Sequence, residues 1–144
     1  MASIPLAHRV AHGDSISRHH RFDAADIADF AHRSGDHNPV HRDGAAGGAS
    51  RFGKRIASAE HTISLLLGLA ASWLAERGTA IGLGCSFRFT AAVREGDTLE
   101  LKWTVTQTYA KESLQGLIVC FEGDATNQDG LVAMKGTLEM LLQE

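Results

Sequence analysis

The sequence predicts an α+β protein in which an antiparallel sheet curls around one long, buried helix. Residues 59–76 are apolar on nearly every side of a helix, and a helix of that kind is usually buried. From residue 81 onward, apolar residues alternate with polar ones, which is the period of strands. A helix packed on one face of a sheet is a standard two-layer solution for such a combination.

The composition is that of an ordinary globular protein, with 44% hydrophobic and 22% charged residues. We expect residues 1–144 to form a single domain. The net charge of −3 argues against nucleic acid as a partner. Cys85 and Cys120 lack CxxC spacing and are predicted to be reduced, partly buried thiols of a cytoplasmic protein. Met1–Ser15 shows no signal peptide, and the apolar run 63–74 is shorter than the about 20 residues of a membrane span.

The amino-terminal part is predicted to contain a strand and a helix. Ser15–Phe22 is a candidate strand, in which His19 and His20 are interpreted as solvated rather than as ligands. Asp23 is a favoured N-cap, and the apolar residues after it have the spacing of one helical face. Gly35 is a natural stop for this helix.

A dense polar stretch follows, reading Ser-Gly-Asp-His-Asn-Pro-Val-His over residues 34–41. Asn38 is a good N-cap and Pro39 suits the first helical position, so a short helix is predicted to run from Pro39 to about Gly47, where Gly47-Gly48 ends it. Asp36 and His41 flank the turn, which can aim a carboxylate and an imidazole at one water molecule.

The long helix is expected to begin after Ser58, its candidate N-cap. The backbone N–H groups at its start, near Ala59, lack helical partners and can stabilise a developing oxyanion. A water held by Asp36 and His41 opposite such a donor can add to, or leave from, the β-carbon of an α,β-unsaturated carbonyl compound.

Four strands joined by short connections are predicted to follow as a meander. Their ranges are Ile81–Val93, Thr98–Tyr109, Leu117–Phe121 and Leu131–Leu142. Arg94–Asp97 and Asn127–Gly130 are turn sequences. On the second strand, one face is expected to carry Leu99, Leu101, Trp103, Val105 and Tyr109. Because the edges of such a sheet stay open, we expect a homodimer that extends it.

The spacing alone leaves other interpretations of the polar stretch open. Asp36 and His41 can be a capping acid and a surface histidine. A metal ion can instead be held by Asp36, His37, His41 and Asp43, although this spacing is not a standard signature. A nucleophilic role for Cys85 or Cys120 is a further alternative.

Phe30 together with residues 34–41 resembles the signature of the MaoC-like, (R)-specific enoyl-CoA hydratases and dehydratases. The similarity continues through Arg51–Gly53 and Ile56–Ser58 into the long helix, and more weakly through Phe87–Phe89. It covers most of the chain from about Arg21. The resemblance implies the hot-dog fold, in which a sheet wraps around one long helix, and a dimer.

The resemblance also implies a reaction and roles for five residues. Asp36 and His41 would bind and activate water, Asn38 would support the loop, Ser58 would contact substrate, and the N–H of Ala59 would bind the thioester oxygen. The implied reaction is the reversible hydration of a trans-2-enoyl-CoA, or a related acyl carrier thioester, to the (R)-3-hydroxyacyl thioester in fatty acid metabolism. It needs neither a cofactor nor a metal.

This sequence departs from the family pattern at two points, and both keep alternative functions open. Many relatives carry His-Gly where this chain has Ser58-Ala59, and Glu60 adds a negative charge beside them. A hot-dog acyl-CoA thioesterase, or a catalytically weak acyl-thioester-binding subunit, therefore remains as an alternative function.

Overall fold

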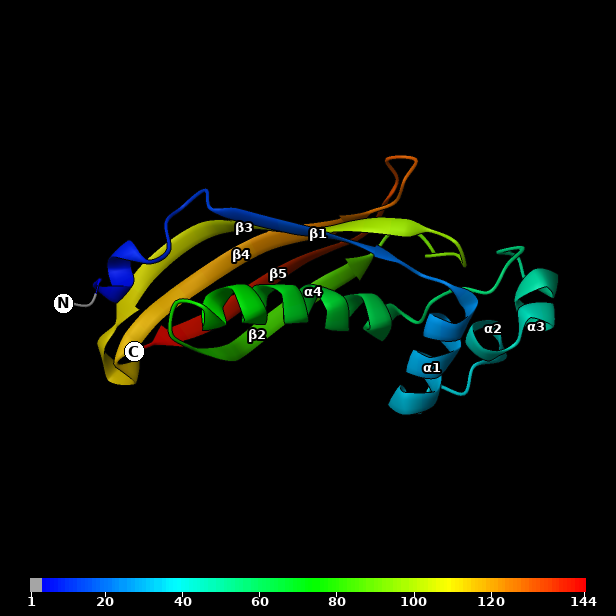
Figure 1. Cartoon of the computed structure of the whole chain (residues 1–144), viewed down its shortest axis with the longest axis horizontal. Coiled ribbons are helices and arrows are strands. Elements are labelled where there is room, and N and C mark those ends of the chain that lie inside the picture. The colour runs from blue at the N-terminus through cyan, green and yellow to red at the C-terminus, as the bar shows by residue number, and fades with distance from the viewer. Residues whose placement is uncertain (1–3) are drawn as a thin grey trace.

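The computed structural model shows a five-stranded antiparallel sheet that arches over one long helix (Figure 1). It describes residues 4–144; Met1–Ser3, which belong to the segment predicted to lack a signal peptide, lie outside the described residues. The elements in chain order are η1 (Leu6–His8), β1 (Ser15–Arg21), α1 (Ala24–Ser34), α2 (Pro39–Arg42), α3 (Gly44–Ala49), α4 (Ala59–Ala75), β2 (Thr79–Phe89), β3 (Thr98–Lys111), η2 (Glu112–Leu114), β4 (Gly116–Thr126) and β5 (Val132–Gln143).

The strand order is β1-β3-β4-β5-β2, with every neighbouring pair antiparallel. Only β3, β4 and β5 form the predicted meander. The expected pairing of β2 with β3 is wrong, because β2 pairs with β5 at the far edge of the sheet. A short turn joins α4 to β2, so β2 lies beside the helix at the edge of the sheet. Residues 90–97 then connect β2 to β3.

The sheet and α4 enclose the core, which confirms the predicted layer arrangement. Trp103 on β3 is fully buried, and its indole Nε1–H donates to the carbonyl oxygen of Leu66 on α4 at 2.7 Å. Only one side of α4 is covered, however, since Ser64, Gly68 and Ser72 are exposed. The expectation that the helix is buried on all sides is therefore wrong. Within residues 4–144, no helix is both long and apolar enough to cross a membrane.

Tyr109 was expected on the same face of β3 as Leu99 and Trp103, and this is wrong because Tyr109 is 41% exposed while those residues are buried. The pairing of β3 with β4 shifts between Val105 and Gln107. Such a bulge reverses the alternation of faces beyond it. Before the bulge the prediction is confirmed, since Leu99, Leu101, Trp103 and Val105 are all buried.

Helices α1, α2 and α3 gather at the amino-terminal end of α4, opposite the two chain termini (Figure 1). The predicted caps of α1 are confirmed: the Asp23 carboxylate accepts from the N–H of Asp26, and Gly35 adopts the left-handed conformation. The single helix predicted from Pro39 to Gly47 is instead two helices. Asp43 separates them in an extended conformation and caps α3 by accepting from the N–H of Ala45.

Gly47 and Gly48 lie inside α3 and do not end it. Gly47 serves close packing, since a Cβ at this position would lie 2.4 Å from the backbone nitrogen of Arg55. Glycine at residue 47 therefore lets α3 touch the segment that leads to α4.

Candidate active site

A cavity of about 480 Å³ opens beside the amino-terminal end of α4. Its polar wall contains Asp36, His41, Ser58 and Glu60, and Ala59 lies between the last two. An apolar wall comes from distant strands and includes Phe89 and Met134. Four of the five predicted site residues thus line one cavity, and the backbone N–H of the fifth, Asn38, donates to Asp36.

His41 is held in one orientation by the loop before α4. The side chain is 9% exposed, and its Nδ1 lies 2.7 Å from the carbonyl oxygen of Ile56. A carbonyl oxygen can only accept, so Nδ1 carries the hydrogen and donates it. Nε2 then faces Asp36, with 3.4 Å between Nε2 and Oδ2. In the neutral imidazole this nitrogen has a free lone pair.

Asp36 is held as a carboxylate. Its Oδ1 accepts a hydrogen bond from the backbone N–H of Asn38 at 3.0 Å, and this bond is the main reason why the pKa of Asp36 is lowered from 3.8. The proximity of His41 lowers the pKa further, while burial opposes both effects. Asp36 is therefore ionised at neutral pH.

Asn38 caps α2 as predicted. Its side-chain oxygen accepts from the N–H of Val40, although the distance of 3.4 Å makes this bond weak. Its backbone N–H contacts Asp36, so the cap and the carboxylate are fixed by the same residue.

Ser58 is the N-cap residue of α4, but its side chain makes no capping hydrogen bond. Its Oγ is buried and has no hydrogen-bond partner within the described part of the chain. Ala59 is the first residue of the helix, where a backbone N–H has no intrahelical acceptor. Both residues line the cavity, so possible hydrogen-bond donors share it with Asp36 and His41.

The metal set considered for the polar stretch is not assembled. The carboxylate of Asp43 caps α3, and exposed His37 accepts from the Arg42 guanidinium at 2.9 Å. The expectation of a solvated side chain fits His19, whose side chain is 67% exposed. It is wrong for His20, which lies 2.7 Å from the Asp26 carboxylate.

Sequence patterns missed two features near the site. Phe89 and Met134 complete the cavity only through the pairing of β2 with β5, and no local signal announces that contact. His61 is buried on α4, and a signal for it was present: a histidine within an otherwise apolar helical face. The two cysteines are free as predicted, but Cys85 is exposed rather than partly buried.

Comparisons with known proteins identify a family and a fold. A family model described as "MaoC like domain" matches residues 6–120. The 3-hydroxybutyryl-CoA dehydratase of Methylorubrum extorquens is 30% identical over 113 residues, which span 78% of this chain and 71% of that protein.

Solved structures of similar proteins show the same fold. The unliganded R-hydratase PhaJ1 from Pseudomonas aeruginosa superposes with a TM-score of 0.86 at 30% identity, covering 99% of this chain and 87% of that one. The (R)-hydratase of A. caviae involved in PHA biosynthesis gives 0.83 at 29% identity, covering 92% and 97%. The MaoC-like dehydratase from Rhodospirillum rubrum gives 0.82 at 30% identity, covering 97% of each chain. These matches confirm the predicted hot-dog fold.

Proposed function

This chain belongs to the MaoC-like domain family, and from that premise we propose that it catalyses the reversible hydration of a trans-2-enoyl-CoA to the (R)-3-hydroxyacyl-CoA. The observation that carries the proposal is the meeting of Asp36 and His41 at one wall of the cavity, with 3.4 Å between carboxylate oxygen and imidazole nitrogen.

The arrangement of the pair suits the binding of water. Asp36 is ionised, and in the tautomer that donates from Nδ1 to Ile56, His41 Nε2 is an acceptor, so two acceptors face each other. A water molecule can donate one hydrogen to each of them. Such a water keeps its oxygen lone pairs free to attack the β-carbon of the enoyl group.

The reaction then needs two proton transfers, one from the water to the pair and one from the pair to the substrate. As the water oxygen bonds to the β-carbon, one of its protons passes to the pair, and His41 Nε2 is the base with the free lone pair. The same proton is returned to the α-carbon, which becomes a CH₂ group. Negative charge builds up on the thioester oxygen in between, and the N–H of Ala59 would stabilise it, with Ser58 beside it.

The substrate proposed for a first test is short. The related Methylorubrum protein is named for a four-carbon acyl group, 3-hydroxybutyryl-CoA, so crotonyl-CoA is the corresponding enoyl thioester. An acyl carrier thioester is the alternative. We also propose that the enzyme acts in fatty acid metabolism in the cytoplasm, which its two free cysteines suit.

We further propose that residues 1–144 act as one domain and that two copies form a homodimer through β2. This strand is an edge of the sheet, and it exposes Ile81, Leu83 and Phe89. A partner strand paired there would cover these apolar side chains, which is a common way to remove an open edge.

Replacement of Asp36 by Asn tests the assignment. This variant should fold, and it should hydrate crotonyl-CoA about a hundredfold or more slowly, because it loses the charge that helps to hold and activate water. The loss of the enoyl absorbance measures the rate. Asp29→Asn is the matched control, since this acid is 63% exposed on α1 and pairs with Arg33. Equal turnover of Asp36→Asn and wild type would contradict the proposal.

A thioesterase is the second candidate function. It is favoured by Glu60, which places another carboxyl group in the cavity. A thioesterase would release free CoA thiol from crotonyl-CoA while the double bond remains. Measuring thiol release and enoyl absorbance on the same sample separates the two activities. The configuration of the hydroxyacyl product tests the (R) assignment.

A further inference from the structure

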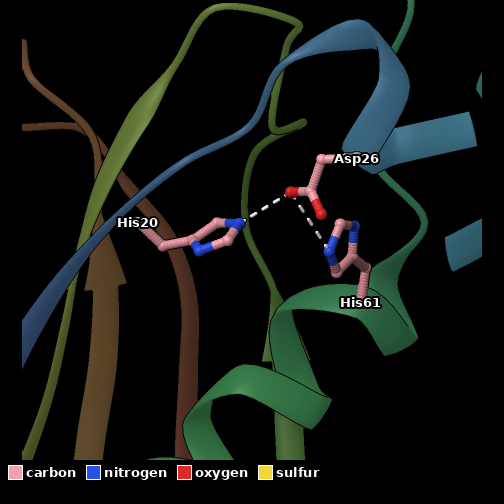
Figure 2. A group of neighbouring side chains, drawn as sticks. All are labelled: His20, Asp26 and His61. Carbon is pink, nitrogen blue, oxygen red and sulfur yellow. Dashed lines mark hydrogen bonds and ion pairs between the residues drawn. The ribbon is translucent and has the colours of Figure 1, made fainter. Parts of the chain in front are cut away.

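Three residues from separate elements meet on the other side of the first turn of α4. His20 comes from β1, Asp26 from the first turn of α1 and His61 from α4, and both imidazole rings point at the carboxylate (Figure 2). Oδ2 of Asp26 lies 2.7 Å from Nε2 of His20 and 3.5 Å from Nε2 of His61. None of the three lines the cavity of Asp36 and His41.

The spacing of these atoms is close to that of ligands around one ion. The three candidate ligand atoms all lie within 4.8 Å of one another. Zinc binds imidazole nitrogen and carboxylate oxygen at about 2.0–2.2 Å, so two ligand atoms on a tetrahedral ion lie roughly 3.3 Å apart. Small side-chain rotations would bring the three atoms to that spacing.

His61 is an unusual residue for its surroundings. It is 3% exposed, its ring stacks on Phe30 with 4.4 Å between centroids, and Phe22 packs against it edge-on at 4.9 Å. Its Nδ1 is buried without a hydrogen-bond partner in the described residues. A polar ring among aromatic rings is costly unless it makes a strong interaction, and its Nε2 is aimed at the cluster.

We propose that His20, Asp26 and His61 bind one divalent transition-metal ion of the zinc class. Two imidazoles and one carboxylate suit zinc, cobalt and nickel, whereas magnesium and calcium prefer oxygen ligands throughout. Three protein ligands leave a coordination position for water. His20 and Asp26 have side chains 29% and 34% exposed, so the ion can enter from solvent.

The ion would join β1, α1 and α4 at the point where α4 begins. Asp26 is already held in place, because its backbone N–H donates to the Asp23 carboxylate at 2.9 Å. Metal binding should therefore stabilise the folded chain, since no such set of ligands is assembled in the unfolded one. This inference does not rest on the proposed hydratase activity, because binding is measured directly.

Calorimetric titration of the chelator-treated, full-length protein with zinc tests the site. We expect one ion per chain and a higher Tm with zinc, but no binding of magnesium. His20→Gln, Asp26→Asn and His61→Leu should each weaken zinc binding by about a hundredfold or more, since even a lost supporting contact of a ligand costs up to about a hundredfold. Cobalt in place of zinc should give the absorption bands of a nitrogen-ligated ion.

His19→Gln is the matched control. It removes a neighbouring histidine of β1 that is 67% exposed and lies 3.5 Å from Glu100 instead. This variant should bind zinc like the wild type. Circular dichroism in the presence of chelator shows which variants fold without metal, and only the zinc affinities of folded variants are compared. If no variant folds, the cobalt absorption spectrum of the wild-type protein tests the site. Absence of zinc binding by the wild type, unchanged affinity in the folded ligand variants, or equal loss in His19→Gln would overturn the proposal and leave a purely hydrogen-bonded cluster.

Discussion

Ala59 places a methyl group in the wall of the cavity, beside the N–H proposed to bind the thioester oxygen. If the methyl holds that oxygen away, Ala59→Gly should raise kcat/KM for crotonyl-CoA, by up to about a hundredfold, the effect of a misplacement of about 1 Å. The substitution should also lower the free energy of unfolding by up to about 1 kcal/mol. Steady-state kinetics and urea unfolding measure the two effects.

Ala75→Gly is the control for this prediction. It introduces the same residue at the exposed carboxyl-terminal end of α4, far from the cavity. Ala75→Gly should not raise kcat/KM for crotonyl-CoA. Equal kinetics of Ala59→Gly and wild type would show that the methyl group does not limit the reaction.

The lowered pKa of Asp36 predicts how its contribution to stability depends on pH. The hydrogen bond from Asn38 N–H lowers the pKa of Asp36 in the folded state below 3.8, so its carboxylate stabilises the fold above that pH. This contribution is lost as the pH falls through the folded-state value. The difference in unfolding free energy between wild type and Asp36→Asn should shrink as the pH falls below about pH 4.

Urea unfolding of both proteins over this pH range checks the prediction. If the difference in unfolding free energy between the two proteins grew below about pH 4, the prediction would be contradicted. The pKa of Asp36 would then have to be raised in the folded state. Asp29→Asn, which changes an exposed acid, gives the background of a general charge effect.

At the scale of single residues, the sequence was informative where groups are close along the chain. Asp36 and His41 are five positions apart across an Asn-Pro turn, so local geometry alone brings them near each other. The tautomer of His41 could not be predicted, because it depends on the carbonyl of Ile56, which long-range packing places there. The same holds for His20, whose contact with Asp26 requires β1 to lie beside α1.

At the scale of elements, helix α3 depends on one glycine for its position. A Cβ at Gly47 would lie within 2.7 Å of backbone atoms of Lys54 and Arg55. Gly47→Ala should therefore push α3 from this segment and destabilise the fold by about 1–3 kcal/mol. It should also lower kcat, because Ile56, which orients His41, follows directly.

Gly48→Ala is the matched variant in the same helix. Nothing lies within 4 Å of a Cβ at Gly48, so alanine there should stabilise the protein, by up to about 1 kcal/mol. Thermal and urea unfolding of the pair measure the contrast. If both substitutions behaved alike, close packing of Gly47 would not be the reason for glycine at that position.

These glycines also show why element boundaries were harder to predict than elements. From sequence, paired glycines indicate a helix end, and only the contact with Arg55 reveals that the first glycine is needed for packing within α3. In β3 the alternation predicted the inner face correctly as far as Val105, and the bulge after it reversed the side on which Tyr109 lies. Caps were predicted well because they depend on adjacent residues, as at Asp23 and Gly35.

At the scale of the whole molecule, the layer arrangement followed from periodicity, but the strand order did not. A long apolar helix followed by alternating strands requires a sheet that covers the helix, and that much is local information. The position of β2 beside β5 is a pairing between segments distant in the sequence, which no local pattern reveals. This choice has a consequence for assembly, because it leaves the apolar strand β2 at an open edge.

The proposed dimer predicts the behaviour of variants at this edge. Ile81 and Leu83 are 43% and 44% exposed in the single chain, and charged residues on an edge strand oppose the pairing of two sheets. Ile81→Lys combined with Leu83→Lys should shift the mass measured by sedimentation or light scattering from dimer to monomer. Leu131→Lys is the matched control, since Leu131 is 48% exposed next to the turn between β4 and β5. It should leave the mass of a dimer unchanged. A wild-type monomer, or a double variant that remains dimeric, would show that β2 is not the interface.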